Sequence, residues 1–113
     1  MTSDARLPNA EQLTLVAFLK AKHGQEEELG RRLLTLFEKA RAEDGNINYD
    51  LHRSSEAPDT WMLYENWRSP ADLDAHFALP YMRQFVSTLD EVLEGEMDLR
   101  RFSMKTPFIG PKA

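Results

Sequence analysis

Three residues in the second half of the chain carry side chains that can move a proton or bind a flat ring. Glu65 and Trp67 alternate in one apolar run, and His76 follows nine residues after Trp67. An acid, a large aromatic ring and an imidazole that face one apolar space are what a small-molecule site needs. An unperturbed imidazole has a pKa of roughly 6.5, which suits proton transfer near neutral pH.

Glu65 shares its strand face with Trp61, Leu63 and Trp67 if the run from 60 to 67 is a strand. A carboxylate on an apolar face costs free energy unless it is paired or protonated. Two interpretations follow from this position. Either the pKa of Glu65 is raised and the side chain can carry a proton, or Glu65 forms a structural ion pair, for instance with Arg101 of the last strand.

His76 lies three residues after Leu73 and four before Pro80. Because Leu73 should face the core, His76 should lie near the sheet-facing side of the same helix. It is then either the proton acceptor of a site or a half-buried histidine whose ring nitrogens bind the backbone. Trp67 either stacks on a flat substrate or belongs to the core.

Three further residues are candidates for substrate binding. Tyr49 and Tyr64 can donate a hydrogen bond to a substrate oxygen, or simply fill a face of the sheet. Asn46 can orient a carbonyl, although Gly45-Asn46 also has a sufficient conformational reason as a turn. No metal is expected, because the chain has no cysteine and only three histidines, none at a helical ligand spacing.

The elements that must position these residues follow a β-α-β-β-α-β order. Alternation and helical periodicity predict strands at 11–21, 46–53, 60–67 and 96–104, and helices at 25–42 and 69–93, the second of them split at Pro80. Ser69 is a natural N-cap and Pro70 suits the first helical position. This order predicts an α+β, ferredoxin-like fold.

The strand faces predict which residues meet. Within 46–53, Ile47, Tyr49 and Leu51 share one face and the polar residues take the other. The first strand is apolar on both faces, with Val16 and Phe18 opposite in parity to its leucines. One layer of helices covers only one face of a sheet, so the other face predicts a second copy of the chain and hence a homodimer.

The length of 113 residues predicts one domain at 11–104, with a flexible tail at 1–10 and a tail or arm at 105–113. The net charge of −5 argues against nucleic acid and anionic membranes as partners. The apolar runs are far shorter than the roughly 20 residues of a membrane helix. Residues 1–10 lack the apolar stretch of a signal peptide, so a cytoplasmic location is expected.

Four segments together resemble the antibiotic biosynthesis monooxygenase family of dimeric α+β barrels, which includes quinol monooxygenase-like proteins. The segments are LTLVAFLKAKHG, RAEDGNINYDLHR, WMLYENW and SPADLDAHFALPYMRQF. The likeness covers about residues 12–104. It implies a homodimer whose two sheets pair back to back, and a separate site between sheet and helices in each protomer.

The resemblance also implies an oxidoreductase. Well-characterised members oxygenate phenolic or hydroquinone substrates with dioxygen and use neither metal nor flavin, so no cofactor is expected. The expected partners are a small aromatic substrate and dioxygen. By resemblance His76 is the base or proton shuttle, and the site contains Asn46, Tyr49, Tyr64, Glu65, Trp67 and His76. Parity places Tyr64 opposite Trp67, which argues against Tyr64.

Relatives in the same superfamily suggest other functions. The haem-degrading branch needs a histidine on the later helix, and residues 81–93 contain none. An isomerase of a small keto-sugar phosphate, of the autoinducer-breakdown type, has a similar Gly-Asn strand start but needs an anion site, which the sequence does not show as a cluster. Tyr81 stands where many relatives carry a histidine. A non-catalytic, dimeric small-molecule-binding domain is the remaining alternative.

Overall fold

The computed structural model describes residues 11–106, so the expected tail at 1–10 and most of that at 105–113 lie outside the described residues. Four antiparallel strands form one sheet in the order β2-β3-β1-β4. The strands are β1 (Leu13–Lys20), β2 (Asn46–Arg53), β3 (Thr60–Trp67) and β4 (Asp98–Phe102). The helices are α1 (Glu26–Leu34), α2 (Phe37–Arg41), α3 (Pro70–Ala78), α4 (Pro80–Ser87) and the 3₁₀ turn η2 (Leu89–Glu91).

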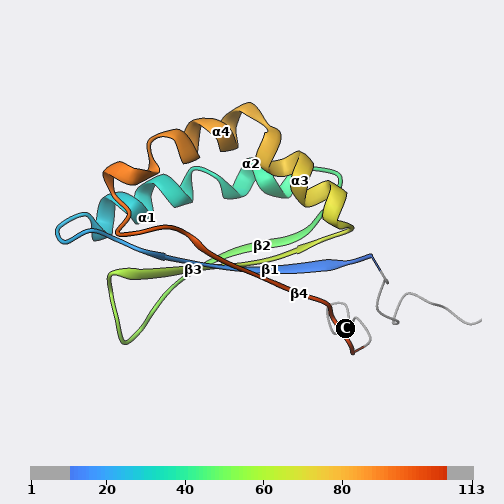
Figure 1. The fold of residues 1–113 in the computed structure, drawn as a ribbon, viewed down its shortest axis with the longest axis horizontal. Coiled ribbons are helices and arrows are strands. Elements are labelled where there is room, and N and C mark those ends of the chain that lie inside the picture. The colour runs from blue at the N-terminus through green and yellow to red at the C-terminus, as the bar shows by residue number, and fades with distance from the viewer. Residues whose placement is uncertain (1–10, 107–113) are drawn as a thin grey trace, which may run out of the picture.

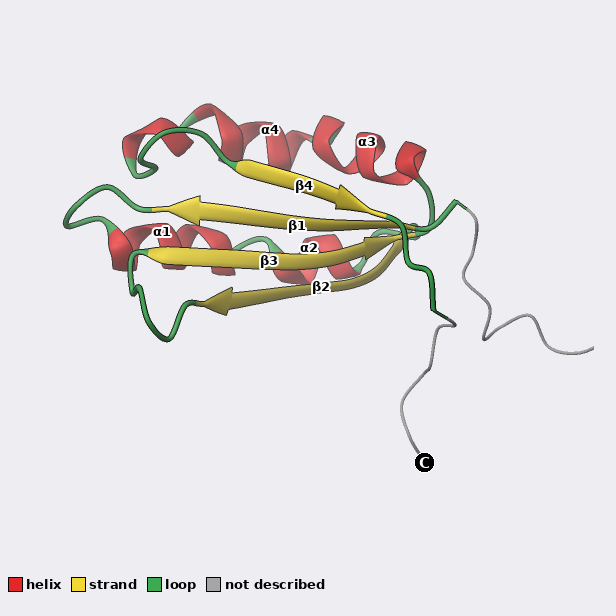
Figure 2. Cartoon of the chain, turned by 60° about the horizontal axis from the view of Figure 1, so that its bottom comes forward, coloured by secondary structure: helices red, strands yellow, loops and turns green. Residues whose placement is uncertain are grey.

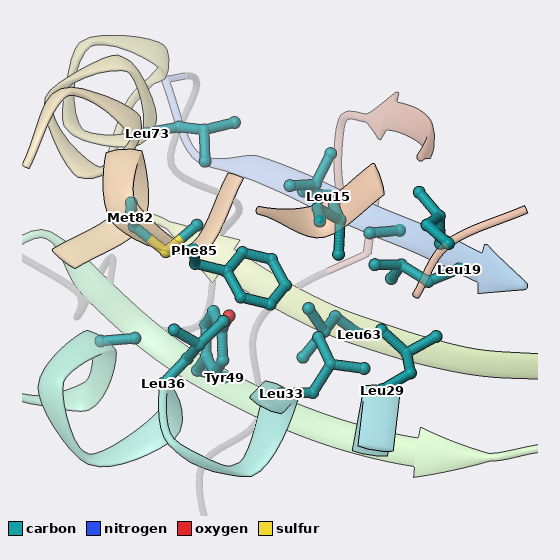
Figure 3. Packing of buried hydrophobic residues seen from close by; sticks show 14 of the residues in the cluster. Leu15, Leu19, Leu29, Leu33, Leu36, Tyr49, Leu63, Leu73, Met82 and Phe85 are labelled. Atoms are coloured by element: carbon teal, nitrogen blue, oxygen red, sulfur yellow. The ribbon is translucent and has the colours of Figure 1, made fainter. Parts of the chain in front are cut away.

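All helices lie on one face of the sheet (Figures 1 and 2). The element order and strand order confirm the predicted ferredoxin-like α+β fold. Leu15 and Leu19 of β1 point toward the helices and are almost fully buried. Figure 3 shows Leu29 and Leu33 of α1 beside Leu63 of β3, and Phe85 of α4 over Tyr49 and Leu36. This apolar layer is the core.

The predicted helix at 25–42 is wrong in one respect, because it is two helices. α1 ends at Leu34 and α2 begins at Phe37. The Thr35 hydroxyl donates to the carbonyl of Arg32 at 2.6 Å, and the Thr35 amide also bonds to Arg32. Hydrogen bonds of this i to i−3 type tighten the turn and interrupt the α-helical pattern.

The predicted elements near the C-terminus are too long. The helix predicted at 81–93 is α4, which ends at Ser87, followed by the short turn η2. The strand predicted at 96–104 spans only Asp98–Phe102.

The first strand is also shorter than predicted. Ala21, predicted as its last residue, instead forms an isolated bridge with Leu93.

The predicted face of Ile47, shared with Tyr49 and Leu51, is wrong because of a β-bulge. The register of β2 against β3 shifts between Asn46 and Asn48, so Ile47 is the extra residue and is 43% exposed rather than core-facing. Beyond the bulge the alternation holds, and Tyr49 lies directly opposite Glu65 on β3. Bulges of this kind often re-aim side chains beside functional sites.

The start of α3 follows the predicted signals. The Ser69 hydroxyl accepts a hydrogen bond from the Asp72 amide, and Pro70 occupies the first turn. Leu79 is extended before Pro80, which separates α3 from α4. The break places Tyr81, the second residue of α4, beside the last turn of α3.

The opposite face of the sheet is not covered by the helices (Figures 1 and 2). Val16 and Phe18 lie on it and are half-buried, and Tyr64, the cross-strand neighbour of Val16, is 37% exposed. Asn66 on the same face is buried and accepts hydrogen bonds from Gln12 and Thr14.

In the described part of the chain, none of the helices combines the length and the apolar character that a bilayer-spanning segment needs.

Candidate active site

His76 lies on the inner side of α3 and is 1% exposed. Its Nδ1 is 2.7 Å from Oε2 of Glu43, in the loop between α2 and β2. The same carboxylate oxygen accepts a hydrogen bond from the Tyr81 hydroxyl at 2.5 Å, and that hydroxyl is 3.3 Å from His76 Nδ1. Three polar side chains from three segments therefore meet at one oxygen.

This contact determines which nitrogen of His76 is available. A carboxylate at Nδ1 favours the tautomer that carries its proton there, and leaves Nε2 as the acceptor. No hydrogen bond between described residues engages Nε2. Burial lowers the pKa of His76, and the hydrogen bond and charge of Glu43 oppose that shift. His76 is therefore a neutral, oriented imidazole near neutral pH.

Glu65 is buried on the inner face of β3. Its Oε1 accepts a hydrogen bond from Trp67 Nε1 at 2.8 Å. Burial raises the pKa of Glu65 to about 7, although the bond from Trp67 lowers it. The alternative ion pair with Arg101 is not formed, because Leu15 of β1 lies between these two residues in the sheet register. With this pKa, Glu65 is partly protonated near neutral pH.

Tyr49 lies beside Glu65 and is 1% exposed. Its hydroxyl is buried and has no hydrogen-bond partner among the described residues. Burial raises the pKa of Tyr49, so the hydroxyl stays protonated and remains a donor. Figure 3 shows the ring pointing from β2 into the core toward Phe85. An unsatisfied buried hydroxyl costs about 1–3 kcal/mol, which a bound acceptor would offset.

A narrow cavity connects these groups. Tyr49, Glu65 and His76 all line it, among apolar side chains from the sheet, α3 and α4. Its volume is only about 10 Å³, which is room for about one water molecule. The sequence predicted a hollow for a flat ring, and this closed cavity does not have that size.

A larger groove begins where the cavity ends. Phe77, Met97 and Leu99 line both the cavity and a groove of about 460 Å³ between α4 and β4. Phe77 and Met97 are half-buried, and Leu99 is 42% exposed. These three side chains therefore separate the buried polar groups from the surface.

The predicted site residues are brought together only in part. Glu65, His76 and Tyr49 meet at the cavity. Trp67 is fully buried and does not line the cavity. Its ring packs against His76 with centroids 4.6 Å apart and its indole nitrogen donates to Glu65, which agrees with the core alternative for Trp67.

Two predicted residues lie outside the cavity. Tyr64 is on the opposite face of the sheet, as its parity indicated. The Asn46 side chain donates to the carbonyl of Asn48 and is occupied by the turn that starts β2. Neither residue lines the cavity beside His76.

Sequence reasoning missed Glu43 and gave Tyr81 no role. Glu43 follows α2 in a charged segment, where its type and position resemble ordinary surface residues. Tyr81 follows the helix break at Pro80, and that break was the available signal that it turns back toward His76. No group of three or more His, Cys, Asp or Glu side chains within residues 11–106 is placed to hold a metal ion.

Comparisons with known proteins agree with this arrangement. The model of the antibiotic biosynthesis monooxygenase family matches residues 12–88. The Bacillus subtilis protein YcnE is 29% identical over 79% of this chain and 94% of its own. The Synechocystis protein sll1783 is 28% identical over 76% of this chain, which spans only 58% of its length.

A solved structure of protein SO0527 from Shewanella oneidensis has a TM-score of 0.81 and 26% identity, over 86% of this chain and 94% of that one. It supports the same sheet and helix arrangement for this sequence. The family match extends over well more than half of the chain. The chain therefore belongs to the antibiotic biosynthesis monooxygenase family.

Proposed function

We propose that this protein is a cofactor-independent monooxygenase that oxidises a quinol-like or polyphenolic small molecule with dioxygen. One observation carries the proposal. A buried histidine is held at Nδ1 by a carboxylate, and it lines a cavity beside an unpartnered tyrosine hydroxyl. His76 as a base, Glu43 as its orienting carboxylate and the Tyr49 hydroxyl as a hydrogen-bond donor are the groups that deprotonation of a phenol requires.

His76 acts as the base in this proposal. Its Nε2 accepts the phenolic proton, and Glu43 stabilises the imidazolium that forms, because the two groups are 2.7 Å apart. The resulting phenolate is electron-rich and reduces dioxygen directly. The substrate supplies all the electrons, so that one oxygen atom enters the product and the other leaves as water.

Tyr49 and Glu65 serve the substrate oxygens. The Tyr49 hydroxyl donates a hydrogen bond to the developing oxyanion, and the low dielectric of the buried site strengthens that bond. Glu65, whose pKa of about 7 lies near ambient pH, returns a proton to the reduced oxygen. Trp67 and Tyr81 position Glu65 and Glu43, respectively.

Substrate entry requires side-chain movement. A cavity of about 10 Å³ excludes an aromatic ring, and the groove beyond it holds about 460 Å³. In the proposal, Phe77, Met97 and Leu99 rotate away and join the two spaces. The same three side chains then return behind the bound ring and exclude water from the reaction.

The test is oxygen uptake with naphthalene diols, anthrones and substituted hydroquinones. We expect His76→Ala to reduce the rate by about 10²–10⁴-fold, the usual contribution of a general base. The matched control is His52→Ala, because His52 is exposed on β2 and lies on the face of the sheet opposite to Tyr49 and the cavity. No uptake across the panel, or equal losses in both variants, would contradict the proposal.

The small cavity also favours a second candidate, a non-catalytic, dimeric small-molecule-binding domain. In that case the contacts among Glu43, His76 and Tyr81 serve stability alone. A ligand from the panel would then bind in calorimetry and be recovered unchanged after aerobic incubation. An isomerase would instead give product without oxygen.

A further inference from the structure

The groove between α4 and β4 has an unusual distribution of charge. Its walls are apolar and come from Phe77, Val86, Met97 and Leu99, whereas Arg83 and Arg101 also line it. Arg83 lies on α4 and Arg101 on β4, so the two arginines line the groove from different elements. Both arginines are exposed, in a chain whose net charge is −5.

These two arginines differ from the others that the structure describes. Each of the other six has a nitrogen within 3.0 Å of a carboxylate oxygen, and these are Arg31, Arg32, Arg41, Arg53, Arg68 and Arg100. Arg101 is 3.8 Å from Asp74, beyond hydrogen-bond distance. No ion pair within residues 11–106 involves Arg83.

We propose that Arg83 and Arg101 form an anion-binding site at the groove mouth, which selects phenolic substrates that carry a carboxylate. The inference rests on the proposed function, because it assumes that a phenolic ring passes through this groove toward His76. A guanidinium presents paired N–H donors that match a carboxylate, and these two arginines have donors to spare. The apolar walls suit the ring that must lie between anion and cavity.

The position of the groove fits this role. It shares Phe77, Met97 and Leu99 with the cavity that contains Glu65 and His76. A ligand held by its carboxylate at the mouth therefore directs its ring toward the side chains that must move. The arginines also attract an acidic ligand to the groove despite the negative charge of the chain as a whole.

The experiment compares two ligands that differ in one charge. Homogentisate is a hydroquinone with an acetate arm, and its methyl ester is neutral. Binding is measured by calorimetry without oxygen, so that turnover does not interfere. We expect the acid to bind about tenfold more tightly than the ester to the wild-type protein, as charge-assisted hydrogen bonds at an exposed site allow. The preference should weaken as salt is added.

The variants separate this site from a general effect of charge. In the double variant Arg83→Gln, Arg101→Gln, the two ligands should bind within about twofold of each other. Arg100→Gln is the matched control, because Arg100 is the neighbour of Arg101 but contacts Phe18 on the opposite face and pairs with Asp98. It should keep the full preference.

Three results would overturn the inference. They are equal binding of acid and ester to the wild type, no binding of either ligand, and a loss of preference in Arg100→Gln as large as in the double variant. Failure of the proposed function looks different. A preference for the acid that depends on Arg83 and Arg101, without oxygen uptake under air, would support the anion site and contradict the monooxygenase.

Discussion

His76 and Glu65 are both buried in the same cavity, but burial moves their pKa values in opposite directions. It lowers the pKa of the imidazole and raises that of the carboxyl to about 7, because each charged form is poorly solvated there. Near neutral pH the cavity therefore contains a neutral base and an acid that is partly protonated. Pairs of titratable groups whose pKa values are shifted in opposite directions by their surroundings are typical of acid–base sites.

Glu43→Gln tests the residue that orients His76. Glu43 raises the pKa of His76 against the larger effect of burial, so its removal lowers that pKa further. Because the neutral imidazole is the proposed base, the acidic limb of the pH–rate profile should move to lower pH. The maximal rate should fall by about 100-fold, since the imidazolium loses its countercharge.

The measurement is the rate of oxygen uptake as a function of pH for the wild type and Glu43→Gln. Tyr81→Phe serves as a comparison, because it removes the hydroxyl donor to Glu43 and keeps the negative charge. An acidic limb at the same pH in the wild type and Glu43→Gln would show that His76 is not the group that titrates.

Glu65→Gln tests the raised pKa through stability. Between the unfolded value of 4.5 and the folded value of about 7, the folded protein holds a proton that the unfolded chain has released. Stability therefore falls as pH rises through this window, by about 3 kcal/mol in total. The variant lacks this titration and should be more stable than the wild type above pH 7 by up to that amount.

Urea unfolding from pH 4 to pH 8 gives the measurement. The difference between the two proteins isolates Glu65, because all other titrating groups are shared. The amide retains an oxygen that can accept the hydrogen bond from Trp67. A difference in the free energy of unfolding that does not vary with pH would contradict a raised pKa.

At the scale of elements, close packing of α1 against the sheet determines where the helices lie. Gly30 is buried in α1, and a Cβ atom there would overlap with the ring of Trp61 on β3. The indole nitrogen of Trp61 donates to the carbonyl of Glu26 at 3.2 Å, one turn earlier. The absence of a side chain at Gly30 therefore leaves the space that the Trp61 ring fills between α1 and the sheet.

Gly30→Ala should destabilise the protein by about 1–3 kcal/mol through overpacking, although alanine favours a helix by about 1 kcal/mol over glycine. In a Trp61→Leu background the same change should become neutral or stabilising, because the obstacle is gone. Thermal unfolding of the four proteins in this cycle measures the coupling. Equal effects of Gly30→Ala in both backgrounds would rule out the contact as the cause.

At the scale of the whole molecule, the face of the sheet opposite the helices bears apolar side chains and a buried polar network. Val16 and Phe18 lie on it next to Tyr64, and Asn66 donates to Asn48 at 2.9 Å across the strands. Such a face is typical of a surface that another chain covers. With the family resemblance, it supports the proposal of a homodimer that pairs the two sheets.

Val16→Asp should convert such a dimer to a monomer, because each copy would place an unpaired charge in the interface. Sedimentation equilibrium should give twice 13.1 kDa for the wild type and 13.1 kDa for the variant. The matched control is Ser55→Asp, which adds the same charge at the exposed turn between β2 and β3. A monomeric wild type would contradict the proposal.

Several features followed from local sequence alone. Alternation predicted β2 and β3 to the residue, and the cap at Ser69 and the break at Pro80 predicted the bounds of α3 closely. These signals are local because strand parity, capping and proline geometry each depend on a few neighbouring residues. The face of Glu65 and the inward position of His76 came from the same signals.

Only the tertiary structure decided what these residues meet. The bulge at Ile47, the loop that places Glu43 against His76, and the closure of the cavity depend on contacts between segments distant along the chain. A sequence pattern states which way a side chain points but not what lies there. The fold class was therefore set by periodicity, whereas the pKa values of Glu65 and His76 were set by packing, because burial and partners determine pKa.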